Sequence, residues 1–183
     1  MIVASFHHRN PKCGDDMHES DEDLLALQKL LNGSYDKAGD HLKSIQGPDL
    51  RLSAEEVTET LKGVCILNLA TVSADGAPYV TPVDGLFLQG QFWFSTSEEA
   101  LKIRHIRQNP KISAAYTIGE SLSVLLHGIA HEVDTSNGKY DHVLDYCLEV
   151  YGPSYAEWGF FGKAPFVRIE PVKMFASRLP SSD

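Results

Sequence analysis

The stretch Phe92–Pro110, FWFSTSEEALKIRHIRQNP, decides how the rest of this 183-residue chain is interpreted. It begins with three large aromatic residues, which are typical of a strand with one buried face. Ser97, followed by two glutamates, is a typical helix start. The helix should end at Asn109, because a residue before proline avoids the helical conformation. The stretch therefore predicts a strand, a turn rich in hydroxyl groups and a basic helix, in that order.

The turn and the helix carry side chains that suit a phosphate group. Ser95 and Thr96 offer hydroxyls beside the predicted helix N-terminus, where backbone N–H groups and the helix dipole favour anions. Lys102, together with Arg104 or Arg107, could add charge-assisted hydrogen bonds. A surface helix whose cations face solvent would show the same pattern, so these residues alone leave both interpretations open.

Apolar segments separated by turn signals predict a small closed antiparallel barrel. Asp75-Gly76 suits a hairpin turn that needs positive φ. Pro82 should place the middle of its strand at a sheet edge or a bulge, since proline cannot donate to a ladder. One helix follows the third strand, and another is expected at 138–152. The expected strands are 64–73, 77–88, 92–96, 111–118, 122–134 and 164–178.

The N-terminal part of the chain is predicted to be helical and separate from the barrel. Ser20–Asp23 resembles a capping box before LLALQKLL, and Gly33 is expected to end that helix. A second capping box, Ser53–Glu56, opens the next region. We therefore expect a tail and helical arm over 1–52, lying on the main domain or on a partner subunit, and a barrel domain over 53–183.

Composition and charge exclude several classes of function. The net charge of -9 argues against general nucleic-acid binding, which needs a basic surface. No apolar run approaches the roughly 20 residues of a membrane span, and the first residues lack the apolar segment of a signal peptide. Cys65 and Cys147 lie in apolar patterns, as expected of reduced core cysteines. We therefore expect a cytoplasmic protein with neither a nucleic-acid nor a membrane partner.

Metal ligation and nucleophilic catalysis find little support in the sequence. His127 and His131 would lie about 13 Å apart at their base on a straight strand, which is too far for one metal ion. No G-x-S-x-G motif is present, and no cysteine has a recognisable activated setting. The sequence therefore assigns no metal site and no catalytic residue. A flexible tail is the simpler explanation for four residues that match no ligand spacing: His7, His8, Cys13 and His18.

Four features in fixed order resemble the pyridoxamine 5'-phosphate oxidase-like split-barrel family over roughly residues 55 to 178. They are LATVSADGAPYVTPVDG, the strand FWFST, a lysine followed seven residues later by Asn-Pro, and a strand containing HGIAHEV. The resemblance implies a mainly β fold with peripheral helices, a split β-barrel of about six antiparallel strands. It also implies a homodimer that binds FMN, or a related deazaflavin, in a groove between the two barrels.

The resemblance also implies positions for the cofactor. Ser95 and Thr96 would lie beside the ribityl phosphate, and Lys102 would reach it. The strand over 81–86 would run along the isoalloxazine ring and offer it backbone hydrogen bonds. Ser123 falls where the oxidase itself offers a glutamine. The implied cofactor-binding residues are Thr81, Pro82, Val83, Ser95, Thr96, Lys102 and Ser123.

Departures from the oxidase pattern limit what is expected of the reaction. The oxidase has arginine, lysine and arginine where this chain has Thr81, Leu86 and Leu101, and its substrate-gripping C-terminal segment has no counterpart in MFASRLPSSD. Vitamin B6 oxidation is therefore not expected. The expected activity is that of a flavin-dependent oxidoreductase, which passes hydride between FMN and an unidentified small organic substrate.

Other interpretations remain open at this stage. A deazaflavin would fit the reduced set of cations, and a split barrel could also bind a flavin or haem without turnover. The aromatic residues Trp158, Phe160 and Phe161 could cover the exposed ring face, or they could pack in the core or a dimer interface.

Overall fold

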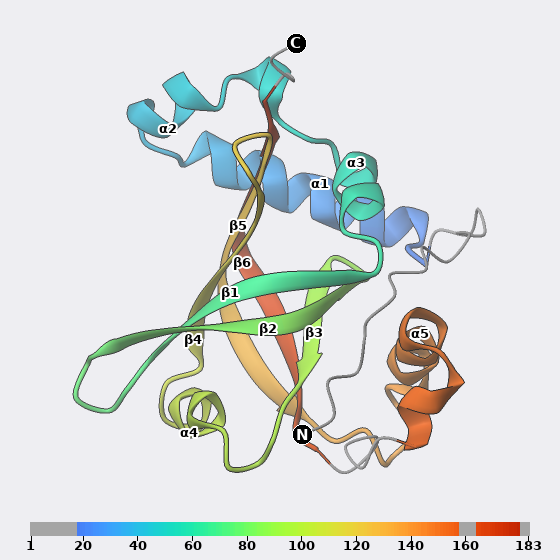
Figure 1. Cartoon of the computed structure of the whole chain (residues 1–183). Helices are drawn as coiled ribbons and strands as arrows, with labels where there is room; N and C mark the ends of the chain where they lie inside the picture. Colours follow the sequence, from blue (N-terminus) through green and yellow to red (C-terminus); the bar gives the residue numbers. More distant parts are fainter. Residues whose placement is uncertain (1–17, 158–163, 180–183) are drawn as a thin grey trace.

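The computed structural model describes residues 18–157 and 164–179, which form a barrel with helices at both ends (Figure 1). The described strands close in the order β1-β2-β3-β6-β5-β4, and all neighbouring strands are antiparallel. The predicted mainly β fold, a split barrel of about six strands, is confirmed. The strands are β1 (Val64–Val72), β2 (Pro78–Leu88), β3 (Gln91–Ser95), β4 (Lys111–Ile118), β5 (Leu122–Val133) and β6 (Phe166–Arg178).

The helices gather at opposite ends of the barrel, with α1, α2 and α3 at one end and α4 and α5 at the other (Figure 1). Both predicted capping boxes are confirmed, since Ser20 and Ser53 each exchange hydrogen bonds with the residue three positions on. Among the described helices, none combines the length and apolar character needed to cross a membrane. The helices are α1 (Asp21–Asp36), α2 (Asp40–Ile45), α3 (Ala54–Thr60), α4 (Leu101–Gln108) and α5 (Asp141–Tyr151), with 3-10 turns η1 (Pro48–Leu50) and η2 (Pro153–Glu157).

Helix α1 does not end at Gly33, and that prediction was wrong. The helix continues through Gly33 to Asp36 because the next two side chains bind the barrel. The Ser34 hydroxyl accepts a hydrogen bond from the backbone N–H of Met174 at 3.0 Å. The Tyr35 hydroxyl donates to the Ala176 carbonyl at 2.9 Å. These contacts with β6 outweigh the low helix propensity of glycine, and they place the arm on the barrel of its own chain.

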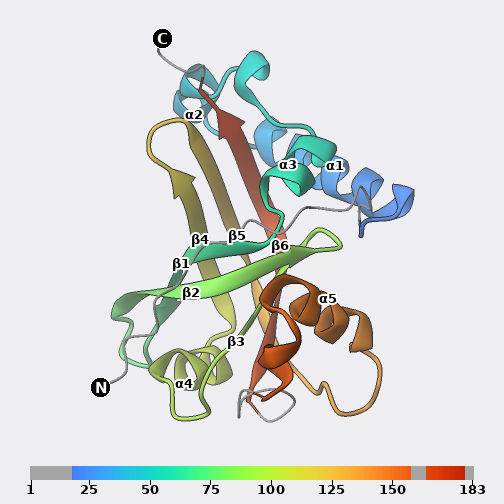
Figure 2. The same ribbon diagram turned by 45° about the vertical axis from the view of Figure 1, so that its right-hand side comes forward.

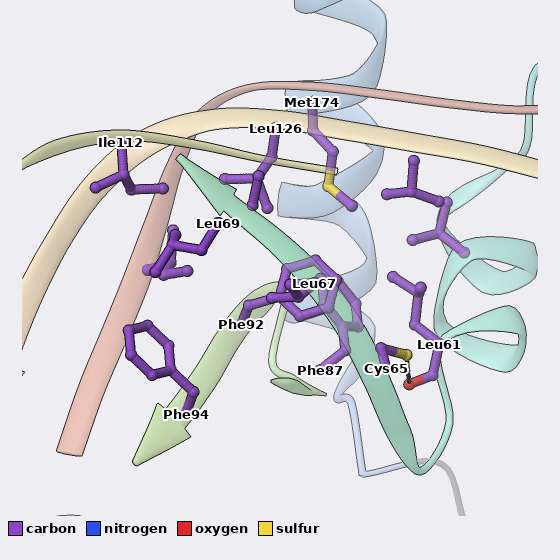
Figure 3. Close-up of a cluster of buried hydrophobic side chains, with 14 of the residues drawn as sticks. Leu61, Cys65, Leu67, Leu69, Phe87, Phe92, Phe94, Ile112, Leu126 and Met174 are labelled. Carbon is purple, nitrogen blue, oxygen red and sulfur yellow. Dashed lines mark hydrogen bonds between the residues drawn. The ribbon is translucent and has the colours of Figure 1, made fainter. Parts of the chain in front are cut away.

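The barrel interior is filled by the inward-facing residues of every strand, as Figure 3 shows. Leu61 contributes a carbonyl that accepts a weak hydrogen bond from the Cys65 thiol at 3.5 Å. Burial raises the pKa of Cys65 to about 12, as expected of an unreactive core thiol. The side chains that meet there include Cys65, Leu67, Leu69, Phe87, Phe92, Phe94, Ile112, Leu126 and Met174.

The barrel wall opens between β2 and β3, where the pairing of these two strands ends. β2 pairs with the whole of β1 over Pro78–Leu86, but in the described residues it pairs with β3 only over Leu86–Leu88. Beyond Trp93, β3 keeps its pairing with β6, which runs over Phe92–Ser95 on its other edge. We call this opening the fork. Pro82 lies on its unpaired arm, so the predicted edge position is confirmed, without a bulge. In Figure 2, β3 leaves β2 and runs down between α4 and α5.

Candidate functional site

A cavity of about 350 Å³ occupies the fork, a size within the usual range for small-molecule sites. The side chains of β2 form one wall, and α5 with η2 forms the other. Large apolar side chains form the floor, and hydroxyl groups with one lysine form a polar end. The lining residues are Pro82, Val83, Asp84, Leu86, Trp93, Phe94, Ser95, Thr96, Ser97, Lys102, Cys147, Tyr151, Tyr155 and Phe166.

The polar end of the cavity lies where β3 ends and the segment before α4 begins. The backbone N–H of Thr96 donates to the Pro165 carbonyl at 3.2 Å, which fixes the chain just after the strand. The Lys102 ammonium group lies 3.4 Å from the Thr96 hydroxyl. The Ser95 hydroxyl lies 3.4 Å from the hydroxyl of Tyr155. Three hydroxyls and one cation therefore line a single end of the cavity.

The helix after β3 starts later than predicted. It begins at Leu101, and its N-cap residue, Ala100, makes no side-chain capping bond. Ser97 instead binds locally, because its hydroxyl accepts from the backbone N–H of Glu99 at 3.3 Å and donates to the Glu99 carboxylate. The predicted helix start at Ser97 was therefore wrong. The anion-binding potential of this end rests on the hydroxyls and Lys102 rather than on a capped helix N-terminus.

Packing against the barrel aims α4 so that Lys102 faces the cavity. Ile103 and Ile106 are buried, and Nδ1 of the buried His105 lies 3.0 Å from the Thr71 hydroxyl on β1. Residues two apart on a helix point in different directions, so Arg104 is exposed and lies outside the cavity lining.

Arg107 cannot supply the missing phosphate charge. Its guanidinium binds Glu132 through two hydrogen bonds, from Nε at 2.8 Å and from Nη2 at 2.6 Å. It also binds Glu98, with Nη2 3.0 Å from Oε2 of that carboxylate. These bonds tie the segment before α4 to the end of β5. Among the described residues that line the cavity, Lys102 is the cation, and it forms no ion pair with a described carboxylate.

The structure brings five of the seven predicted cofactor-binding residues to the cavity: Pro82, Val83, Ser95, Thr96 and Lys102. Thr81 and Ser123 are not among its described lining residues. The Thr81 hydroxyl is nevertheless buried on the same strand without a hydrogen-bond partner in the described residues. Ser123 lies on β5 between Thr117 and Ser177 of the neighbouring strands. The roles of all seven remain predictions.

The second wall was missed by sequence reasoning. Helical spacing predicted α5, but it did not reveal that Cys147 and Tyr151 would line a cavity together with Tyr155. Burial, and to a lesser extent the Asp84 carboxylate, raises the pKa of both tyrosines. Burial raises the pKa of Cys147 to about 12. At neutral pH this wall therefore presents neutral hydroxyls and a protonated thiol, which is not a nucleophile.

The two strand histidines each have a local partner. Nδ1 of His127 lies 2.7 Å from the Ser113 hydroxyl, and Nε2 of His131 lies 3.1 Å from the Glu170 carboxylate. Within the described residues, no group of three or more His, Cys, Asp or Glu side chains could hold a metal ion. Six further residues discussed from the sequence lie outside the described residues: His7, His8, Cys13, Trp158, Phe160 and Phe161.

Solved structures from several organisms share this fold. A conserved hypothetical protein from Mycobacterium tuberculosis is 20% identical with a TM-score of 0.63, and the match covers 75% of this chain and 95% of that one. A FAD-binding protein from Mesorhizobium loti is 24% identical with a TM-score of 0.56, covering 70% and 96%. HutZ, the heme storage protein from Vibrio cholerae, is 20% identical with a TM-score of 0.57, covering 67% and 93%. At such identities the likeness shows the fold.

The sequence itself matches one family. Comparison with curated proteins found no match. Residues 53–176, well over half of the chain, match the family model described as pyridoxamine 5'-phosphate oxidase. This range begins at the second capping box and spans all six described strands nearly to the end of β6. The chain therefore belongs to the pyridoxamine 5'-phosphate oxidase-like split-barrel family.

Proposed function

We propose that this protein is a flavin-dependent oxidoreductase that holds FMN in the fork and passes hydride between the flavin and a small organic substrate. One observation carries the proposal: Ser95, Thr96 and Lys102 converge at one end of a cavity whose floor is apolar and aromatic. A phosphate fits the first part and a flat ring system fits the second. The FAD-binding relative from Mesorhizobium loti supports a flavin in this fold.

The backbone of β2 suits the polar edge of a flavin ring. The β2–β3 ladder ends at Leu86 opposite Trp93, so the arm from Pro82 to Asp84 has no partner among the described strands on the fork side. Backbone groups alternate along an antiparallel strand, which turns the N–H and C=O of Asp84 toward the fork. The carbonyl of Pro82 also points toward the fork, but proline has no N–H to offer. The strand therefore offers donors and acceptors that a ring with carbonyl and N–H groups could satisfy.

The described residues would bind and shield the cofactor rather than take part in bond changes. Bound flavin supplies the hydride chemistry. Lys102 and the neighbouring hydroxyls would hold the phosphate, and the wall formed by Tyr151 and Tyr155 would exclude water from one side. No described residue is assigned a catalytic role. Vitamin B6 oxidation is not proposed, because the chain lacks the cations expected for it at Thr81, Leu86 and Leu101.

Identifying the native chromophore tests this function. The protein would be purified as expressed, its bound chromophore released by heat, and the released molecule identified by mass. We expect FMN. A deazaflavin would keep the fork and its phosphate end but restrict the chemistry to hydride transfer. Haem, or a preparation that takes up no flavin from added FMN, would contradict the proposal and favour the non-catalytic alternatives.

We also propose that the protein is a homodimer that uses the outer face of the barrel. Large apolar residues are exposed there on three strands: Ile66 is 49% exposed, Val80 63% and Val172 59%. A groove of about 370 Å³, lined by Ala70, Val72 and other residues of four strands, lies on the same face. Contiguous exposed apolar surface marks an interaction site. Ile66 pairs with Asp84 in the β1–β2 ladder, so this face borders the fork.

A lysine at Ile66 should break the dimer, because it would bury a charge in an apolar interface. Analytical ultracentrifugation should show a wild-type dimer and a largely monomeric Ile66→Lys variant. Flavin fluorescence should show weaker FMN binding in that variant. Leu25→Lys is the matched control, since Leu25 is 72% exposed on α1, a helix at one end of the barrel (Figure 1). A wild-type monomer, or an Ile66→Lys protein that is still dimeric, would rule out this interface.

A further inference from the structure

The polar end of the cavity includes a hydroxyl from a distant part of the chain. Tyr155, in η2, lies 60 positions after Ser95, yet their hydroxyl oxygens are 3.4 Å apart. Tyr155 is only 7% exposed, and it lines the cavity together with Ser95, Thr96 and Lys102. This contact joins the strand end predicted to bind phosphate to a wall that the sequence did not predict.

The position of Tyr155 is fixed by the turn that follows α5. Gly152 ends α5 with a φ of +83°, a backbone conformation that residues with a side chain rarely adopt. This reversal lets the backbone N–H of Tyr155 donate to the Gly152 carbonyl at 3.0 Å. The ring then stacks on Tyr151, with centroids 4.7 Å apart and planes 17° from parallel. The hydroxyl is therefore held at the cavity by backbone and ring contacts together.

The hydroxyls at this end are poised to donate to an anion. Both the Ser95–Tyr155 and the Lys102–Thr96 contacts measure 3.4 Å, which is longer than well-formed hydrogen bonds of their types. Burial raises the pKa of Tyr155, so its hydroxyl keeps its proton at neutral pH. Phosphate oxygens accept several hydrogen bonds at once, and they could replace these two long contacts with shorter ones.

We propose that Tyr155 is a phosphate-binding residue, whose hydroxyl donates to the same phosphate group as Ser95 and Lys102. The inference rests on the proposed function and adds to it a donor from outside the strand and helix that form the rest of the site. It also accounts for a phosphate site whose described lining offers one cation, Lys102, where the oxidase pattern has several. A buried neutral hydroxyl lowers the energy of a bound anion without adding a charge that must be desolvated.

Comparing FMN with riboflavin isolates the phosphate, because the two differ only in that group. The dissociation constants of both would be measured by flavin fluorescence for wild-type protein and for Tyr155→Phe. Hydrogen bonds to charged groups contribute about 1.5–3 kcal/mol, so the preference for FMN over riboflavin should fall by about tenfold or more in the variant. Riboflavin affinity should stay at the wild-type value.

Tyr146→Phe is the matched control. Tyr146 is 6% exposed and belongs with Tyr155 to one cluster of buried side chains, but its hydroxyl accepts from the Gly63 N–H at 3.2 Å and lies outside the cavity lining. This variant should keep the wild-type preference for FMN. An unchanged preference in Tyr155→Phe, or an equal loss for riboflavin, would overturn the inference and leave the proposed function standing. Wild-type protein that binds neither flavin, or binds both equally, would overturn the two together.

Discussion

Replacing Lys102 with alanine should weaken FMN binding by about tenfold or more and leave riboflavin binding unchanged. The lysine is the cation among the described residues of the cavity lining, and its ammonium group lies 3.4 Å from the Thr96 hydroxyl at the polar end. Its loss removes a charge-assisted contact that only a phosphate-bearing flavin can make. Fluorescence titration with each flavin measures the effect.

Arg104→Ala is the control on the same helix. Arg104 carries the same charge, but it is exposed and outside the cavity lining, so its loss should change FMN affinity by less than about twofold. Raised salt should weaken FMN binding to wild-type protein more than to Lys102→Ala. Identical FMN titrations for wild-type protein and Lys102→Ala would remove Lys102 from the site. A comparable loss in Arg104→Ala would indicate a diffuse surface effect instead.

Replacing Gly128 with alanine should destabilise the barrel by about 3 kcal/mol or prevent folding. A Cβ atom at Gly128 would lie 2.4 Å from the backbone carbonyl oxygen of Glu170 and 3.3 Å from the Ile169 side chain. The position lies at the register shift where β5 meets β6, opposite Pro171. Because the closest atom belongs to the backbone, the clash can be relieved only by moving the strand. Urea denaturation followed by circular dichroism gives the change in unfolding free energy.

The same substitution at Gly33 should have the opposite effect on the stability of the protein. A Cβ atom at Gly33 would meet nothing within 4 Å, and the residue lies inside α1. Alanine there should stabilise the protein by up to about 1 kcal/mol, because glycine is the poorer helix former. Gly128→Ala with wild-type stability would mean that the β5–β6 junction is looser than the structure indicates.

The barrel was predictable because its signals are local. Alternating apolar residues and tight turns fix each strand within a few residues, so all six predicted strands are present. Pro82 predicted an edge or a bulge, because proline removes a ladder donor wherever it lies, and the structure has the edge. The capping boxes at Ser20 and Ser53 likewise depend only on residues three positions apart.

Most of the errors arose where distant contacts decide the outcome. α1 continues past Gly33 because its end binds β6, which lies about 140 positions further along the chain. Arg107 is held by Glu132, 25 positions further along the chain, and by Glu98, rather than left for phosphate. The late start of the helix after β3 has a local cause instead, because Ser97 binds Glu99 two positions on. The contact between Ser95 and Tyr155 spans 60 positions, a separation at which neither alternation nor helical spacing carries information.

A crystal structure of the protein soaked with FMN would locate the phosphate. We expect its oxygens about 3 Å from the Lys102 ammonium group and from the hydroxyls of Ser95 and Thr96, with the ring extending along β2 over the apolar floor of the fork. FMN bound elsewhere, or a phosphate turned away from the junction of β3 and α4, would contradict the proposed site and the flavin chemistry inferred from it.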